Sequence, residues 1–141
     1  MSTTTNAILL VGRVLFVALF LVSARGHIVN HERYVTIAKG RIPFPSVAGW
    51  PVGVWLTLAS ISMVLGIWPD LGSLMMALFL VPTTVFFHAF WTFSDPAQRR
   101  TQQSNFFRNM SLLGATLALL ALFSVAGPGR FAITGTLFNL R

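Results

Sequence analysis

The stretch GVWLTLASISMVLGIWPDLGSLMMALFLVPTTVFF, residues 53–87, decides the fold. It consists of two long apolar runs separated only by Trp68, Pro69 and Asp70. A helix rises 1.5 Å per residue, so about 20 apolar residues cross the roughly 30 Å hydrocarbon core of a bilayer. In that core each backbone N–H and C=O must be hydrogen-bonded within the protein, and a helix achieves this within one segment. Residues 53–87 therefore predict two antiparallel membrane helices joined by a tight turn.

Apolar segments of this kind account for most of the chain. Its 141 residues are 55% hydrophobic and 9% charged, whereas a soluble domain is about one quarter charged. The sequence predicts one integral membrane domain over residues 1–141, an all-α antiparallel bundle of four transmembrane helices. The predicted spans are Ala7–Ala24, Val47–Trp68, Leu71–Phe93 and Phe106–Ala126. A cleaved signal peptide is the alternative for the first span, but apolar residues 8–11 precede Arg13, where a charged n-region would stand.

The polar connections between the spans predict two further features. Within the first connection, residues 25–45, the stretch 27–38 predicts a short helix lying on the membrane surface. The third connection, residues 94–105, is predicted to be a loop. In this loop Pro96 stops the preceding helix, and Asn105 or the serine before it caps the next one.

Basic residues set the predicted orientation in the membrane. The net charge of +7 arises from ten Lys or Arg residues against Glu32, Asp70 and Asp95. No soluble domain is left to carry a nucleic-acid-binding face, so these charges indicate topology and not nucleic acid. The positive-inside rule places the first and third connections in the cytoplasm and both chain ends outside. The residues counted are Arg25, Arg33, Lys39, Arg41, Arg99 and Arg100 on one side, and Arg130 and Arg141 on the other.

Several classes of site are excluded by composition. Cysteine is absent, which excludes disulfides, thiolate metal sites and cysteine catalysis. The three acidic residues all lie outside the predicted spans, so no carboxylate-bridged metal centre is expected. No glycine-rich phosphate loop and no Ser/His/acid set is visible.

Arg13 is a charged residue about two turns into the first span, where an unpaired charge costs a few kcal/mol. Its guanidinium either extends toward the nearer membrane surface or bonds a buried partner. The antiparallel second span offers Thr57, Ser60 and Ser62 as acceptors at a suitable depth, and Asp70 lies at the same surface.

His88 is the second ionisable residue in an apolar span, about 7–8 Å from the predicted helix end at Phe93. The antiparallel fourth span begins close to Arg108 and Asn109, which brings this pair to a similar depth. The end of the first span adds His27 at the same level. The sequence therefore predicts a polar cluster near the cytoplasmic end of the bundle.

Three roles of this cluster stay open. His88 can make a purely structural hydrogen bond to a neighbouring helix. Alternatively, it can belong to a redox or proton-relay site in which a quinone carbonyl is bonded and aromatic rings flank the quinone. Haem ligation is the third role, with His27 or His31 as the second ligand. The candidate cofactor-binding residues are His27, His88, Trp91, Arg108 and Asn109.

Four motifs carry a resemblance to a known family. They are GRVLFVALFLVSARGHI at 12–28, LGIWPDLGSLMMALFLVPTTVFFHAFW at 65–91, SDPAQRRTQQSNFFRNMSLLGA at 94–115 and AGPGRFAI at 126–133. Together they resemble the DoxX family of small four-helix bacterial membrane proteins, related to the DoxD subunit of thiosulfate:quinone oxidoreductase. By position, the residues that match the family's polar set are Arg13, His88, Asn109 and Arg130.

Two departures from the family pattern concern the same polar set. His27 stands where relatives usually have lysine, and residues 57–62 of the second span lack the acidic residue expected there. If that acid normally pairs with the arginine of the first helix, Arg13 has a weaker partner in this chain. The resemblance implies a multi-pass protein of the bacterial cytoplasmic membrane, associated with respiratory or redox systems, without fixing a reaction.

Three functions are compatible with the sequence. The first, favoured by short length and few acids, is an accessory subunit of a larger membrane complex or a homo-oligomer, without activity of its own. The second is a quinone-linked oxidoreductase subunit with its site around His88. The third is a conduit for small molecules or lipids, for which a single four-helix chain encloses little space.

Overall fold

The computed structural model describes residues 1–138, and in that range the chain is helical, with no β-strand. The elements are α1 (Thr3–Val29), α2 (His31–Ala38), η1 (Pro45–Ala48), α3 (Trp50–Leu65), α4 (Pro69–Phe87), η2 (Phe90–Thr92) and α5 (Pro96–Ala126). Length and composition allow three segments to cross a membrane: α1, the α4–η2 segment Pro69–Thr92, and α5. The prediction of an all-α membrane protein is confirmed. The 16-residue helix α3 is apolar but shorter, so a fourth crossing stays a prediction.

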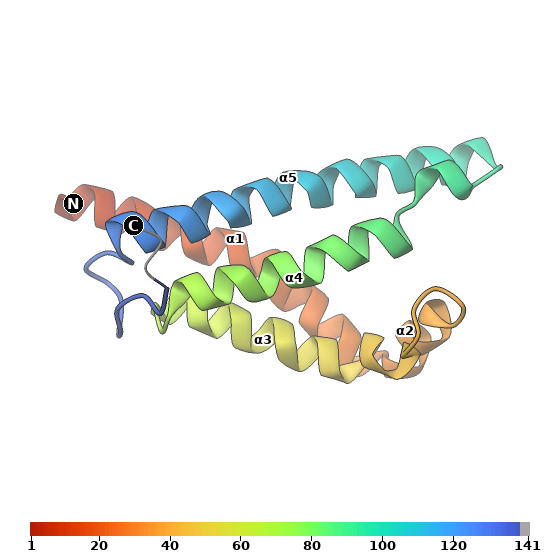
Figure 1. Ribbon diagram of the computed structural model, residues 1–141, viewed down its shortest axis with the longest axis horizontal. Helices are drawn as coiled ribbons and strands as arrows, with labels where there is room; N and C mark the ends of the chain where they lie inside the picture. Colours follow the sequence, from red (N-terminus) through yellow and green to blue (C-terminus); the bar gives the residue numbers. More distant parts are fainter. Residues whose placement is uncertain (139–141) are drawn as a thin grey trace.

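The long helices α1, α3, α4 and α5 alternate in direction (Figure 1). α1 packs on α3, α3 on α4, and α4 on α5, whereas α1 and α5 scarcely touch within residues 1–138. The N-terminus, the end of α5 and residues 127–138 lie with the α3–α4 turn at one end of the molecule, which we call the terminal end. α2 and the α4–α5 connection lie at the opposite end, which we call the α2 end.

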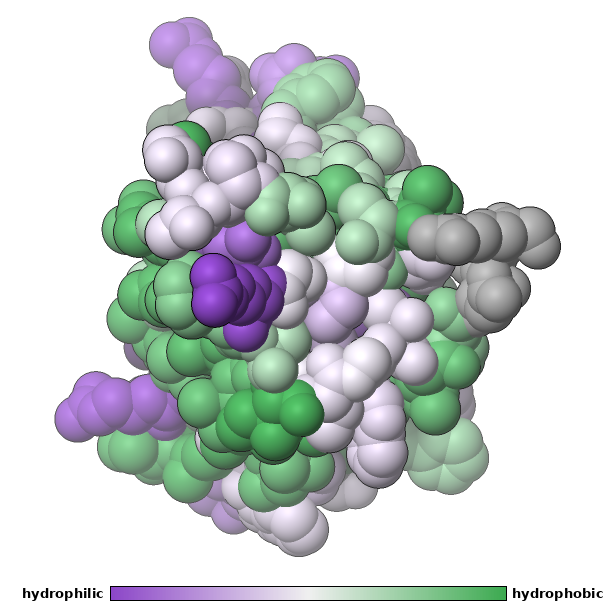
Figure 2. Space-filling model, turned by 90° about the vertical axis from the view of Figure 1, so that its left-hand side faces the viewer, coloured by the Kyte–Doolittle hydropathy of each residue, from purple (hydrophilic) through white to green (hydrophobic). Residues whose placement is uncertain are grey.

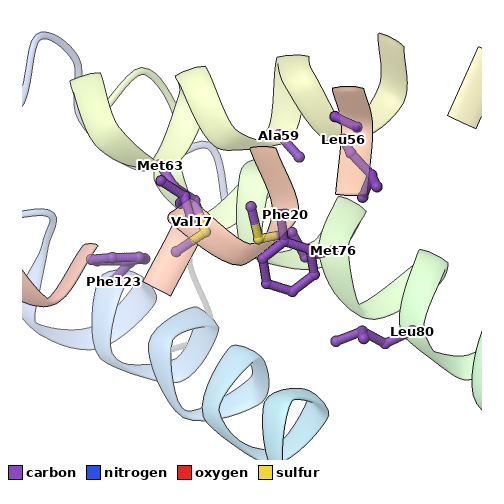
Figure 3. Close-up of a cluster of buried hydrophobic side chains, with 9 residues drawn as sticks. Val17, Phe20, Leu56, Ala59, Met63, Met76, Leu80 and Phe123 are labelled. Atoms are coloured by element: carbon purple, nitrogen blue, oxygen red, sulfur yellow. The ribbon is translucent and has the colours of Figure 1, made fainter. Parts of the chain in front are cut away.

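The core lies where the four long helices meet (Figure 3). Lipid is as apolar as these side chains, so close packing, more than the hydrophobic effect, holds membrane helices together. Glycines at the contacts allow this approach: a Cβ on Gly72 of α4 would lie 2.6 Å from Ser62 Oγ and 2.9 Å from the carbonyl oxygen of Ala59 on α3. The buried core residues are Val17, Phe20, Ala24, Leu56, Ala59, Met63, Met76, Leu80 and Phe123.

The outer surface of the bundle is largely apolar. Figure 2 looks onto the terminal end and shows hydrophobic groups around much of its rim, with paler and hydrophilic groups toward the middle. Large side chains such as Leu15, Leu58 and Leu117 are exposed on three different long helices. A bilayer accounts for such exposure, which water would not favour.

The boundary between α4 and α5 differs from the prediction. α4 ends at Phe87 and not at Phe93, and His88 caps its C-terminus. α5 begins at Pro96, so the predicted loop over residues 94–105 and its cap at Ser104 or Asn105 are wrong. Pro96 occupies the first turn of α5, where its missing N–H costs nothing, and the Asp95 side chain accepts from the N–H of Gln98 at 2.8 Å. Pro96 therefore marks the start of α5 and does not end α4.

Residues 127–138 fold back without helix across the terminal end. Their backbone bonds the end of α3, because Ile133 N donates to Leu65 O at 3.1 Å and Thr134 N donates to Gly66 O at 3.0 Å. The Thr134 hydroxyl also accepts from Trp68 N, which fixes the α3–α4 turn. We call residues 127–138 the C-terminal strap. Arg141, counted above for orientation, lies outside the described residues.

Candidate functional site

The buried Arg13 of α1 holds the C-terminal strap in place by hydrogen bonds. Arg13 is only 1% exposed, so it does not extend to the membrane surface. Its Nη1 donates to Pro128 O at 3.1 Å, and its Nη2 donates to Val64 O at 3.2 Å and Phe131 O at 2.9 Å. A charged donor that satisfies three carbonyls ties α1, the end of α3 and the strap together.

None of the side chains considered as partners of Arg13 bonds it within residues 1–138. The Thr57 hydroxyl donates to Gly53 O, the Ser62 hydroxyl donates to Ile67 O and Trp68 O, and the Ser60 hydroxyl has no partner within residues 1–138. Asp70 is fully buried and accepts from Leu137 N at 3.0 Å and from Phe138 N at 2.5 Å. The polar groups of the terminal end are thus used to hold backbone.

Asn6 completes this arrangement from the first turns of α1. Its Oδ1 accepts from Arg130 N at 2.7 Å, while its Nδ2 donates to Ser2 O at 2.8 Å. Sequence reasoning did not single out Asn6. An amide near a helix start has several possible partners, and only the packing of the strap against α1 selects Arg130 N.

A cavity of about 850 Å³ lies at the α2 end. It is bounded by α1, α2, η1, α3, α4 and α5, and it lies beside the seam between α1 and α5, where the two helices make few contacts. Ligand pockets in proteins range over about 300–1,000 Å³ and combine apolar walls with a few polar groups. Aromatic and aliphatic walls are supplied by residues such as Phe20, Trp55, Phe79, Phe87 and Leu112.

Four of the five candidate binding residues line this cavity: His27, His88, Arg108 and Asn109. Trp91 does not line it, because it lies in η2, half-exposed, with its ring edge-on to Phe90 and Phe106. The cavity wall carries Trp55 instead, whose Nε1 donates to Met75 O at 2.8 Å.

His88 bonds Gln102, a residue predicted to lie in a loop. Its Nδ1 lies 2.7 Å from Gln102 Oε1, and Gln102 also lines the cavity. Because α5 starts ten residues before the predicted span, a polar turn of that helix reaches His88. Within residues 1–138, His88 makes no hydrogen bond to Arg108 or Asn109.

His27 is held from two sides at the end of α1. Its Nδ1 donates to Ala48 O of η1 at 2.5 Å, and its ring stacks on Tyr34 of α2 with 3.9 Å between centroids. With the proton on Nδ1, Nε2 of the neutral ring is an acceptor. The remaining histidine, His31, is used to cap α3, because its Nδ1 accepts from Trp50 N at 3.1 Å.

Asn109 presents its side-chain amide to the cavity. It is 6% exposed, it lines the cavity, and within residues 1–138 its amide has no hydrogen-bond partner. The amide atoms are not fully enclosed by the protein, so a ligand in the cavity can bond them.

Comparison with known proteins identifies the chain's family. The model of the DoxX family, described as DoxX, matches residues 8–89, more than half of the chain. The chain belongs to the DoxX family. The match extends from α1 to just beyond His88 and does not include α5. No curated protein matches the chain, and no solved structure matches it.

In this DoxX protein the matched part and α5 supply different halves of the cavity's polar set. His27 and His88 come from the matched part, whereas Gln102, Arg108 and Asn109 come from α5. The set contains donors in Arg108, Asn109 and the Tyr34 hydroxyl, and acceptors in the free Nε2 of the histidines. Such a site can bond both a carbonyl and a hydroxyl of a flat ring. Within residues 1–138 no three His, Asp or Glu side chains are grouped to hold a metal ion.

Proposed function

We propose that this DoxX protein holds the ring of a quinone-class molecule in the cavity at the α2 end and serves a membrane redox system. The observation that carries the proposal is the Asn109 amide, which lines the cavity and has no hydrogen-bond partner within residues 1–138. A quinone carbonyl is an acceptor for this amide, and the aromatic walls suit a flat apolar ring. A bound quinone supplies the electron-carrying group, while the chain binds and orients it.

The cavity distinguishes this function from that of an accessory subunit or a conduit. A subunit that only supplies shape has no need of a cavity of about 850 Å³ that gathers two histidines, two arginines and an amide within apolar walls. A conduit needs polar groups that continue through the bundle, whereas Arg13, Asn6 and Asp70 at the terminal end are all bonded to backbone.

Replacement of Asn109 by leucine tests the quinone site. We expect an organic extract of the purified variant to contain about tenfold less quinone than an extract of the wild type, because one hydrogen bond of about 1–1.5 kcal/mol is lost. Asn105→Leu is the matched control, since Asn105 lies one turn earlier on α5 and does not line the cavity. Wild-type protein free of quinone, or a haem Soret band in its place, would contradict the proposal.

We further propose that the chain crosses the bacterial cytoplasmic membrane four times with both ends outside. α3 is 16 residues long, but η1 and Gly49 extend the segment before it. Exposed Trp50 and Trp68 at its two ends suit the membrane interfaces. In Figure 1 the α1–α3 connection, with Arg33, Lys39 and Arg41, lies at the same end as the start of α5, which carries Arg99 and Arg100. The positive-inside rule then favours a cytoplasmic position for this end.

Single cysteines test this topology, because the natural chain has none. We expect a membrane-impermeant maleimide to label Thr4→Cys in intact spheroplasts, whereas Thr36→Cys and Gln103→Cys react only after permeabilisation. These three positions are exposed in the folded chain. α4 is long enough to cross, so protection of both later positions requires α3 to cross as well. Labelling of Gln103→Cys from outside would show that it does not.

A further inference from the structure

The cavity at the α2 end is cationic. Two charged residues line it, Arg41 and Arg108, and no acidic residue does. The acidic residues of the chain are engaged elsewhere: Glu32 lies 4.0 Å from His31 Nε2, Asp70 holds the C-terminal strap, and Asp95 caps α5. The formal charge around the cavity is therefore positive even when both of its histidines are neutral.

Within residues 1–138 neither positive charge has an acidic partner. The Arg108 side chain has no hydrogen bond and no ion pair in this range. Arg41 donates one long bond, 3.5 Å, to Phe87 O, and its guanidinium carbon lies 5.8 Å from the centre of the Phe87 ring. A carbonyl and a ring face orient a guanidinium but do not cancel its charge.

The two charges act at the edge of an apolar space. Arg41 and Arg108 are themselves exposed, so salt screens their attraction, while apolar walls from α1, α3 and α4 surround the space that a ring would occupy. The polar amide of Asn109 and the two histidines lie at the same cavity. A ligand that carries a negative charge on its ring is therefore favoured over a neutral ring of equal shape.

We propose that the cavity selects a quinone whose ring carries an acidic hydroxyl, bound as the anion. This inference rests on the quinone site proposed above and adds the chemical class of its ligand. Arg41 and Arg108 attract the ring oxyanion, and Asn109 donates to a ring carbonyl. The alkyl chain lies toward the seam between α1 and α5, where Leu19 and Val22 of α1 line the cavity and are exposed.

Two matched probes test the selection. They are a 2-hydroxy-3-alkyl-1,4-naphthoquinone, which is ionised at neutral pH, and its 2-methoxy analogue, which has the same ring and chain but no charge. Binding to wild-type protein in phosphatidylcholine nanodiscs is read from quenching of tryptophan fluorescence, since Trp55 lines the cavity. We expect the hydroxy probe to bind at least about tenfold more tightly at low salt, and the ratio to fall as ionic strength rises.

Substitutions assign the selection to its residues. In Arg41→Gln and Arg108→Gln the ratio between the two probes should fall toward one, because the hydroxy probe loses more affinity than the methoxy probe. Arg100→Gln is the matched control, because Arg100 is exposed on α5 and does not line the cavity. A ratio that persists in both cavity variants would overturn the assignment.

The outcomes separate this inference from the proposed function. Equal, tight binding of both probes overturns the anion selection and leaves the quinone site intact, whereas binding of neither probe overturns both. Displacement of the hydroxy probe by phosphatidylglycerol added to the nanodiscs would show that the cavity prefers an anionic lipid headgroup, which also overturns the inference.

Discussion

Arg13→Met is expected to lower the free energy of unfolding by about 3 kcal/mol, because it removes a buried charged donor from three part-buried carbonyls. Those carbonyls belong to Val64, Pro128 and Phe131, so the substitution separates the C-terminal strap from α1 and α3. The loss is measured by SDS titration of protein reconstituted in mixed micelles. Release of the strap is measured by the rate of tryptic cleavage after Arg130, followed by mass spectrometry.

Arg13→Lys is the control for charge. Lysine keeps the positive charge but is shorter and has a single donor group, so it cannot reach all three carbonyls with the geometry of the guanidinium. We expect a smaller loss of stability than in Arg13→Met and cleavage after Arg130 that is intermediate. If Arg13→Met were as stable and as resistant to trypsin as the wild type, Arg13 would not hold the strap against α1 and α3.

Gly72→Leu is expected to cost at least about 3 kcal/mol or to prevent folding, because a side chain at this position meets α3 at its backbone. A Cβ there already lies 2.9 Å from Ala59 O, and a carbonyl in a helix cannot move aside as a flexible side chain can. Gly72→Ala should also lower the free energy of unfolding, by a smaller amount than Gly72→Leu. SDS titration and the elution profile in detergent report the change.

Gly114→Leu is the matched control for helix propensity. Gly114 also lies within a long helix, but no atom outside its own helical turn lies within 4 Å of a Cβ built on it. Leucine is a better helix former than glycine by somewhat less than 1 kcal/mol, so this variant should be as stable as the wild type or slightly more stable. Equal losses at both glycines would show that α3 and α4 are not packed as closely as described.

The sequence predicted the positions of the main polar residues but not all of their partners. Burial cost alone identified Arg13 as a residue that needs an explanation, but it could not name the partners, which lie more than a hundred residues away in the strap for two of the three bonds. His27, His88, Arg108 and Asn109 were grouped by depth, and they line one cavity. Gln102 was missed because residues 94–105 read as a loop, although Asp95-Pro96 is a recognisable helix start.

The amino-acid sequence by itself determined that this is a helical membrane protein of the DoxX family. A long apolar segment in lipid can form all of its backbone hydrogen bonds within itself only as a helix. The tertiary structure decided what its polar side chains do. A guanidinium or an amide bonds whichever partner the packing of distant segments brings within about 3 Å. For Arg13 that packing supplies the carbonyls of a C-terminal strap, and for Asn109 it supplies an open cavity.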